Sequence, residues 1–419
     1  GVQPEYGYDD LCANFNEEYK DKGLQVEYVR YVNDDNGNLQ LETYLMGGGD
    51  VDLFIGYGGR TKMDKRVDSN LLLDMSGMLN DIGFNLDDEL GVANMAEYHY
   101  DDGAVYGFPT KYENSRWILI NEDMFKEAGL DIPYDGWTYS EFLADAEKLT
   151  HGEDQDKVYG VCWARKQSGK SILYALDGVL GANQIYKNEE GTEVNFDNDV
   201  YRAGLNLVKE TLDKGYAIPI EDEFSEDISV ANTFLQGKCA IMLGVAQMRL
   251  CMDQENYPHD FMTALVPAPV PDDEKYNTEF YRKQIGTTGA GDLLSISANT
   301  KYPEASFEFA MWYLKGGMSP LVQGGRIPLW NGVNKDEVLS VLKEKAQGSI
   351  DMDSMENYLS LDTTQGVAAI KGHASSEISS AWFEEFDAMC YGKQSVDQTV
   401  QNMEKRGNEL IQTELSSQK

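Results

Sequence analysis

Residues 101–150 constrain the fold more than any other part of the chain. Two short runs, 107–113 and 117–121, are rich in apolar and aromatic residues and predict two successive strands. The tetrad Thr138-Tyr139-Ser140-Glu141 then has the pattern of a capping box, in which Thr138 and Glu141 satisfy each other's free backbone groups. It predicts a helix start. Strands that give way to capped helices within fifty residues indicate an α/β fold.

The same alternation runs along the rest of the chain. Further strands are predicted at 25–31, 51–55, 157–163, 239–243 and 292–297. Helices are predicted at 9–23, 39–46, 138–150, 198–214, 303–314 and 396–415, and most of them open at a cap or a proline and close at a glycine. The runs 51–55 and 239–243 are almost continuously apolar, which is typical of strands covered on both faces. We therefore expect mostly parallel sheets flanked by helices.

Length and charge narrow the classes of protein. A chain of 419 residues predicts two or three domains. No segment approaches the roughly 18 uninterrupted apolar residues of a membrane span, and no basic-then-apolar leader opens the chain, so we expect that an export signal has been removed. A net charge of −37 repels phosphate backbones, so nucleic acid is not an expected partner.

Metal, nucleotide and disulfide sites are not predicted. The five cysteines are scattered and form no CxxC pair. The sequence Ser168-Gly169-Lys170-Ser171 ends like a phosphate-binding loop, but Ala164 stands where that motif needs glycine. The run 33–37 lacks calcium ligands at the first and last loop positions. The acidic residues within 221–227 could hold calcium, although a solvated face is the favoured interpretation. No cofactor is expected.

The amino-acid sequence of residues 101–150 resembles that of the extracellular solute-binding protein family 1, which serves ABC-type sugar importers. The matching pieces are Val105-Tyr106-Gly107-Phe108-Pro109, the strand 117–121 followed by Met124-Phe125-Lys126-Glu127-Ala128-Gly129-Leu130, and Gly136-Trp137-Thr138. The resemblance implies a two-lobed periplasmic-binding-protein-like fold, the Venus flytrap, with a ligand cleft between the lobes. The family usually opens with a strand before its first helix, whereas here only GVQPEYGYD precedes the expected helix.

The resemblance also implies the division into lobes. Lobe one is expected to comprise residues 1–109 plus 271–315, and lobe two 110–270 plus 316–419. The chain would cross between them at 108–113, at 266–271 and near 316–325. The sequence holds no Pro-, Ser- or Gly-rich linker, which fits lobes joined by crossing segments rather than by a tether.

The implied function is capture and delivery of a solute. The resemblance predicts the extracellular substrate-binding component of an ABC importer, which binds a carbohydrate, an oligosaccharide above all, by hinge closure and passes it to a membrane permease. It is expected to be a monomer without catalytic activity. It would be tethered to the cell membrane by an N-terminal lipid anchor, or be periplasmic.

The turn after strand 51–55 is the first candidate ligand site. It reads Gly56-Tyr57-Gly58-Gly59-Arg60, in which glycines let a ligand approach the backbone, Tyr57 offers a ring and Arg60 a planar set of donors. Family members place ligand contacts here. The alternative is an ordinary strand-to-helix turn with exposed Tyr and Arg.

Glu113 occupies a family position that often contributes a side chain to the cleft. A carboxylate accepts hydrogen bonds from sugar hydroxyls. The alternative is a structural ion pair with Lys111 or Arg116, both of which are close in sequence.

Three tryptophans are candidate platforms for sugar rings. Trp163, Trp330 and Trp382 fall where the resemblance places aromatic cleft residues, and the C–H faces of sugars pack well on indole rings. The alternative for each is a place in the core. Trp117 and Trp312, on a predicted strand and on a helical apolar stripe, are interpreted as core.

Two further loops complete the expected site. Family members frequently carry a tryptophan after the strand at 239–243, whereas this chain offers Gln247 and Arg249, which would make a more polar subsite if they reach the ligand. Gly289, before the strand at 292–297, would let the backbone approach the ligand from lobe one.

Two other functions stay open. Among 72 acidic residues a pair of catalytic carboxylates cannot be recognised from sequence, so a carbohydrate-active hydrolase or lyase is the first alternative. A binding protein for a peptide, a polyamine or a metal is the second. The sequence contains neither HExxH nor GxSxG.

Overall fold

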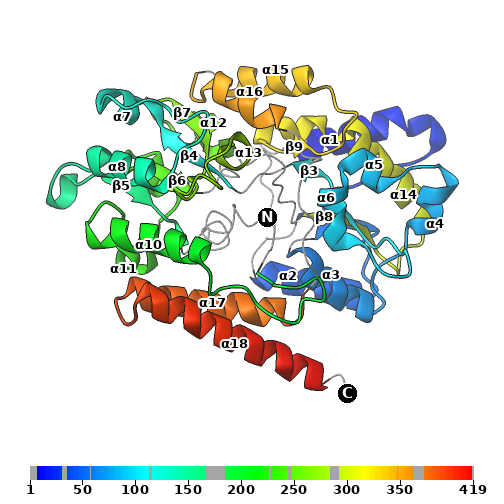
Figure 1. The fold of residues 1–419 in the computed structure, drawn as a ribbon. Helices are drawn as coiled ribbons and strands as arrows, with labels where there is room; N and C mark the ends of the chain where they lie inside the picture. The colour runs from blue at the N-terminus through cyan, green and yellow to red at the C-terminus, as the bar shows by residue number, and fades with distance from the viewer. Residues whose placement is uncertain are drawn as a thin grey trace. The chain divides into compact units, whose positions relative to one another are not determined.

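The structure is a computed structural model that describes residues 7–30, 35–56, 58–112, 116–165, 185–225, 228–243, 248–283, 292–346, 348–361 and 372–417 (Figure 1). The chain forms two compact units. Unit 1 comprises Gly1–Glu113 with Thr288–Lys345, and unit 2 comprises Asn114–Thr287 with Ala346–Lys419. Each expected boundary lies earlier in the chain than the corresponding observed one. The assignment of these units to two ligand-binding lobes stays a prediction.

Unit 1 contains a sheet of three strands in the order β1 (Leu53–Gly56), β8 (Leu293–Ile296), β2 (Phe108–Pro109). Both outer strands run antiparallel to β8, and Gly56 and Pro109 each lie opposite Leu293. The carboxyl ends of β1 and β2 therefore meet at the start of β8. A separate antiparallel pair joins β3 (Lys111–Tyr112) to β9 (Ile327–Pro328).

Unit 1 is rich in helices. They are α1 (Tyr8–Glu18), α2 (Asp35–Met46), α3 (Gly59–Asp68), α4 (Ser76–Asp81), α5 (Leu86–Leu90), α6 (Val92–Met95), α14 (Pro303–Trp312) and α15 (Lys335–Ala346). Of these, α3, α6 and α14 contact the three-stranded sheet. The apolar spacing of α1 buries Phe15, whose ring meets Phe309 and Trp312 of α14 at 4.9 and 5.2 Å between centroids. Asn85 caps α5 by accepting from the N–H of Asp87.

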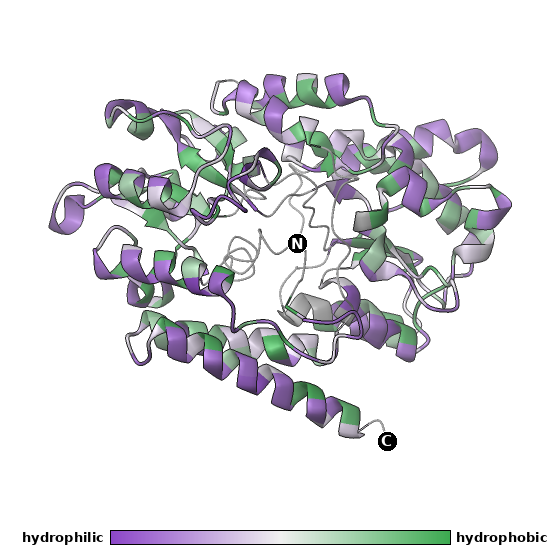
Figure 2. Ribbon diagram, viewed as in Figure 1, coloured by the Kyte–Doolittle hydropathy of each residue, from purple (hydrophilic) through white to green (hydrophobic). Residues whose placement is uncertain are grey.

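Unit 2 contains a sheet of four strands in the order β5 (Tyr159–Cys162), β6 (Cys239–Leu243), β4 (Trp117–Asn121), β7 (Thr263–Pro267). Every residue of β4, β6 and β7 is buried, so these strands are covered on both faces, as the apolar run at 239–243 predicts. In Figure 2 these strands are mostly hydrophobic, whereas the helices carry both hydrophobic and hydrophilic residues.

The helices of unit 2 are α7 (Glu122–Glu127), α8 (Tyr139–Leu149), α10 (Asp199–Asp213), α11 (Ile220–Ser225), α12 (Met248–Met252), α13 (Glu279–Arg282), α16 (Met352–Ser360), α17 (Ser375–Cys390) and α18 (Val396–Ser417). The capping box is confirmed, because Thr138 accepts from the N–H of Glu141 while the Glu141 carboxylate accepts from the N–H of Thr138. Asn198 caps α10 as expected. Within the described ranges, no helix is both long enough and apolar enough to span a membrane.

Two expectations about strands need correction. Among the strand pairs in the described part of the chain, β5–β6 alone is parallel. Strand–helix alternation predicts parallel neighbours when consecutive strands pair, but β8 returns from far along the sequence and separates β1 from β2. The strand expected at 25–31 is not formed over residues 25–30. There Val26 exchanges two hydrogen bonds with the side chain of Asn16 instead of pairing with a strand.

Candidate functional site

The carboxyl ends of β1 and β2 form the first candidate edge, because ligands of open α/β sheets bind beyond such ends. Asp292 directly precedes β8 at this edge, and its Oδ2 lies 3.1 Å from Lys111 Nζ and 3.2 Å from Arg326 Nη1. The Asp292 side chain is only 10 % exposed. One carboxylate thus holds two cationic side chains beside the ends of β2 and β9.

Arg60 lies in the first turn of α3, just after Gly58, whose φ of 93° a side chain would disfavour. Its guanidinium stacks on Tyr100 at 3.8 Å from the ring centre. Nε donates to Asp64 Oδ1 at 2.5 Å, and Nη1 donates to the carbonyls of Glu97 and His99 at 2.8 and 2.9 Å. Arg60 is therefore a fixed guanidinium rather than a freely moving surface side chain.

Tyr100 completes this cluster. Its hydroxyl donates to Asp64 Oδ1 at 2.6 Å, and burial together with that hydrogen bond raises the pKa of Tyr100. The phenol consequently stays protonated and keeps its hydrogen bond throughout the physiological range. This arrangement fixes the carboxylate that in turn orients Arg60.

Trp330 follows β9 in unit 1. Its Nε1 donates to Glu89 Oε2 at 2.7 Å, and a Cβ on Gly332 would lie 2.2 Å from the indole, so Gly332 packs directly on the ring. The side chain is half-buried. Trp330 is thus held by its N–H and by one contact, with part of its surface accessible.

The corresponding edge of unit 2 comprises the carboxyl ends of β5 and β6 and the start of β4, where Ile118 lies opposite Leu243. Trp163 follows β5 but is only 2 % exposed. Its Nε1 donates to Thr211 Oγ1 of α10 at 2.9 Å. Trp382 of α17 is equally buried and stacks on Phe386 at 4.9 Å. Both indoles lie in the core of unit 2, so the core alternative describes their position, and neither presents an open ring face.

Sequence reasoning missed the residues that fix the chain after β5. The backbone N–H of Arg165 donates to Glu223 Oε2 of α11 at 2.5 Å, and its guanidinium donates two bonds, of 2.8 and 2.9 Å, to Asp387 of α17. Ala164, which lies between β5 and Arg165, has a φ of 50°, a backbone conformation that is strained for a residue with a side chain. Arg165 and Asp387 are 222 residues apart, so no local pattern could have revealed the pair.

The same contacts bear on the acidic cluster at 221–227. Glu223 is fully buried and faces Arg165 instead of solvent, while residues 226 and 227 lie outside the described residues. Over the described part of the chain, no three His, Cys, Asp or Glu side chains are grouped as metal ligands would be.

The remaining predicted residues are placed as follows. Tyr57, Glu113, Gln247 and Gly289 lie outside the described residues. Arg249 lies on α12 and is half-buried. Their roles stay predictions.

The two tryptophans interpreted as core differ from each other. Trp117 is buried, as predicted. Trp312 is only partly buried, and its Nε1 donates to Glu18 Oε2 at 2.8 Å.

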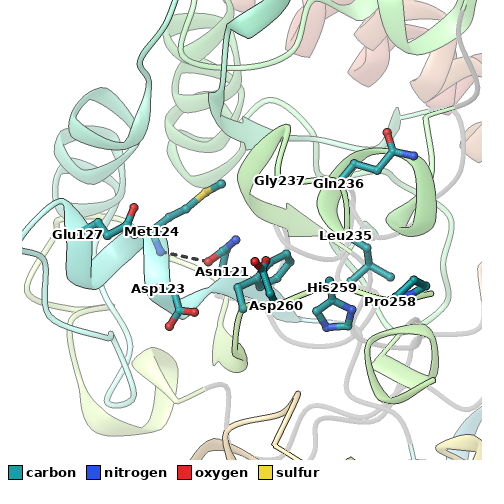
Figure 3. Close-up of a pocket in the computed structure, with 11 residues that line it drawn as sticks. Asn121, Asp123, Met124, Glu127, Leu235, Gln236, Gly237, Pro258, His259 and Asp260 are labelled. Atoms are coloured by element: carbon teal, nitrogen blue, oxygen red, sulfur yellow. Dashed lines mark hydrogen bonds between the residues drawn. The ribbon is translucent and has the colours of Figure 1, made fainter. Parts of the chain in front are cut away.

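A surface pocket of about 720 Å³ lies at the opposite edge of the unit 2 sheet (Figure 3). Its walls come from the end of β4 and α7, from the turn before β6 and from the loop before β7. The lining residues are Asn121, Asp123, Met124, Glu127, Leu235, Gln236, Gly237, Pro258, His259, Asp260 and Phe261. None was a predicted site residue, because three distant segments form the pocket.

Solved structures share this fold along nearly the whole chain. An ABC substrate-binding protein from Listeria monocytogenes in complex with cycloalternan has 17% identity and a TM-score of 0.71, covering 96% of this chain and 94% of its own. The sugar-binding protein MalE from Xanthomonas citri has 16% identity and a TM-score of 0.69, covering 99% and 96%. UgpB from Mycobacterium tuberculosis in complex with glycerophosphocholine has 16% identity and a TM-score of 0.70, covering 98% and 95%.

These similarities confirm the two-lobed α/β fold of periplasmic binding proteins. The family follows from sequence. The model of the bacterial extracellular solute-binding protein family matches residues 2–315, and the chain belongs to that family. Its members are extracellular or periplasmic binding proteins rather than enzymes.

Proposed function

We propose that this protein is the substrate-binding component of an ABC importer, which captures an oligosaccharide outside the cell and delivers it to a membrane permease. The observation that carries the proposal is the family match together with structural similarity to sugar-binding proteins over 96% or more of the chain. The protein acts without catalysis, as a monomer tethered by a lipid anchor or free in a periplasm.

Among the described candidates, Arg60 and Trp330 carry the binding site. Sugar hydroxyls accept hydrogen bonds from a guanidinium that is already oriented by Tyr100 and Asp64, so little side-chain entropy is lost on binding. The accessible part of the Trp330 indole packs on the C–H face of a sugar ring.

Five further contacts rest on the family resemblance alone. They are Tyr57, Glu113, Gln247, Arg249 and Gly289. Trp163 and Trp382 act in this proposal through the core of unit 2, because their rings are buried. Closure requires that the ligand bind the closed state more tightly than the open one.

Calorimetry with a panel of neutral oligosaccharides tests the proposal. We expect at least one α- or β-linked oligosaccharide to bind with a measurable heat and no new reducing ends to form. Glycerophosphocholine belongs in the panel because the M. tuberculosis protein of similar fold binds it. Flat traces for every sugar, or binding of glycerophosphocholine alone, would overturn the carbohydrate assignment, and release of reducing ends would favour a hydrolase.

Arg60→Ala provides the matched test of the site. Loss of a charge-assisted hydrogen bond weakens binding by about 10- to 100-fold. Arg202→Ala is the control, since Arg202 is also ion-paired but lies on α10, near Asp197 and Asp397. Equal affinities for the two variants would remove Arg60 from the site.

A further inference from the structure

We propose that the pocket of Figure 3 is a second binding site, for an organic cation that carries a guanidinium group and a neutral acceptor oxygen. This inference does not rest on the proposed sugar function. It rests on the place of the pocket, its charge, a buried amide and its apolar floor.

The pocket is separate from the candidate ligand edge of unit 2. Asn121, which ends β4, lies opposite Thr263 at the start of β7, whereas Ile118 lies opposite Leu243 at the end of β6. Strand residues advance by about 3.4 Å each, so the pocket and the carboxyl ends of β5 and β6 lie at opposite ends of the strands. A ligand in the pocket would not compete with one at that edge.

The charged groups of the lining all have one sign. Among the described lining residues, Asp123, Glu127 and Asp260 contribute carboxylates and none is Lys or Arg. Glu127 and Asp260 make no hydrogen bond or ion pair with a described residue, and both are exposed. The neighbouring Lys126 is already paired with Glu122 at 2.6 Å. The pocket therefore attracts a cation.

His259 of the lining is held in place by hydrogen-bonding neighbours. Its Nδ1 lies 2.8 Å from the Tyr257 carbonyl and donates to it. Its Nε2 lies 3.1 Å from Nε2 of Gln254, whose amide oxygen already accepts from the His259 N–H.

A buried amide supplies an independent indication of a ligand. Asn121 is only 2 % exposed and lines the pocket. Its Oδ1 accepts from the Met124 N–H at 3.0 Å and caps α7, but its Nδ2 donates to no described residue. This Nδ2 is not among the fully enclosed polar atoms of the described residues, so it remains accessible to a bound molecule. An acceptor oxygen on the bound molecule would provide a partner for Asn121.

The floor of the pocket is apolar. Met124, Leu235 and Phe261 contribute it, and Phe261 is fixed by ring contacts with Phe234 and His259 at 5.5 and 4.9 Å. Carboxylates bind guanidinium groups in paired, charge-assisted hydrogen bonds. A negative wall above an apolar floor thus fits a guanidinium on a short alkyl chain.

Calorimetry with L-argininamide and L-citrullinamide tests the proposal on the full chain. The two molecules have the same shape, but a urea replaces the guanidinium in the second. We expect argininamide to bind at least about tenfold more tightly, because its guanidinium adds paired, charge-assisted bonds to those of the α-ammonium group that both molecules carry. Equal affinity for the two would overturn the proposal.

Matched variants separate the pocket from general attraction to an acidic protein. Glu127→Gln with Asp260→Asn removes two charges from the pocket, whereas Glu189→Gln with Glu190→Gln removes two exposed charges elsewhere in unit 2. The pocket variant should lose about tenfold in affinity and the control less than about twofold. Equal losses would show non-specific attraction and contradict the site.

The acceptor oxygen has its own test. Agmatine resembles argininamide but lacks the carbonyl, so it should bind severalfold more weakly to the natural protein. Asn121→Asp keeps the helix cap, since Asp caps as well as Asn, but removes the amide donor. The advantage of argininamide over agmatine should then disappear. A persistent advantage would contradict the role of Asn121.

Two further binding measurements identify the kind of molecule that carries the cation and distinguish this site from the proposed sugar site. Binding of a Gly-Arg-Gly-Gly peptide without binding of argininamide would indicate docking of a basic protein segment and overturn the small-ligand proposal. Argininamide should also bind a sugar-saturated sample with unchanged affinity. If no sugar binds but argininamide does, the proposed transport function fails while this inference stands.

Discussion

The two sheet edges hold their candidate residues in different ways. In unit 1, Lys111 and Arg326 are held by their charged ends, through Asp292, and Trp330 by its N–H. In unit 2, the entire side chain of Trp163 is packed in the core, and Arg165 is hydrogen-bonded to helices α11 and α17. A side chain held at one end keeps a surface for a ligand, whereas a side chain enclosed by packing can only position its neighbours. Tryptophan is therefore packed differently in the two units.

The largest expected effect is that of Trp163→Ala. Removal of a fully packed indole leaves a cavity and removes the N–H from which the Thr211 hydroxyl accepts, although that hydroxyl still donates to the Val208 carbonyl. The free energy of unfolding falls by about 3–5 kcal/mol. Urea unfolding of the ligand-free protein measures it. Trp382→Phe is the milder companion, because the ring stack on Phe386 is retained. An unchanged midpoint for Trp163→Ala would mean that Trp163 is not enclosed, and would break the comparison.

Asp292→Asn is expected to have the next largest effect. It removes the buried negative charge that both Lys111 and Arg326 contact, at a cost of about 3 kcal/mol. The control is Asp397→Asn, whose carboxylate is 74% exposed beside Arg202 and should cost less than about 1 kcal/mol. Equal losses in urea unfolding would show that the Asp292 cluster is no more than a surface ion pair.

Local patterns in the sequence predicted much of the fold. Apolar runs gave strands β4 and β6 of unit 2, and the capping box of Thr138 and Glu141 gave the start of α8, because these features depend on neighbouring residues alone. The antiparallel pairing in unit 1 could not be predicted in this way. It depends on β8 entering the sheet from a distant part of the chain.

The site was less accessible to prediction than the fold. The sequence around Trp163 and Trp330 does not show which of the two rings is buried, because burial of Trp163 depends on helices from elsewhere in the chain. The clamp of Arg165 by Asp387 joins residues 222 positions apart. The pocket likewise combines three segments that share no motif. Side-chain roles that depend on such distant contacts leave no local signal.

Trp330→Ala tests, through sugar affinity, whether the accessible part of Trp330 in unit 1 contacts the ligand. Loss of an aromatic platform should weaken binding of the transported sugar by about 2- to 10-fold. Trp312→Ala is a closely matched control, because Trp312 also lies in unit 1, is also half-buried and also donates from Nε1 to a glutamate. Similar sugar affinities for the two variants, measured by calorimetry, would place Trp330 outside the site.

Asp145 of α8 provides a further comparison with Asp292. Among the described residues, no cation forms an ion pair with the Asp145 carboxylate. Burial raises the pKa of Asp145 to about 6; Lys148 opposes this, while Glu141 and Asp131 add to it. The folded state therefore favours the protonated acid. This contribution to stability is fully present below the ordinary pKa of about 3.9 and is lost as the pH rises through about 6.

Asp145→Asn should accordingly gain stability relative to the natural protein between pH 4 and pH 7, by about 1 kcal/mol once the partial exposure of the side chain is allowed for. Glu385→Gln is the control of opposite sign. Although burial opposes it, hydrogen bonding to Arg406 helps to lower the pKa of Glu385, so its carboxylate stabilises the fold at neutral pH and that contribution is lost as the pH falls. Melting temperatures of both variants across this range should diverge from the natural protein in opposite directions. If the melting temperatures of the two variants changed in the same direction, the absence of an ion pair at Asp145 would have no effect on the stability of the fold.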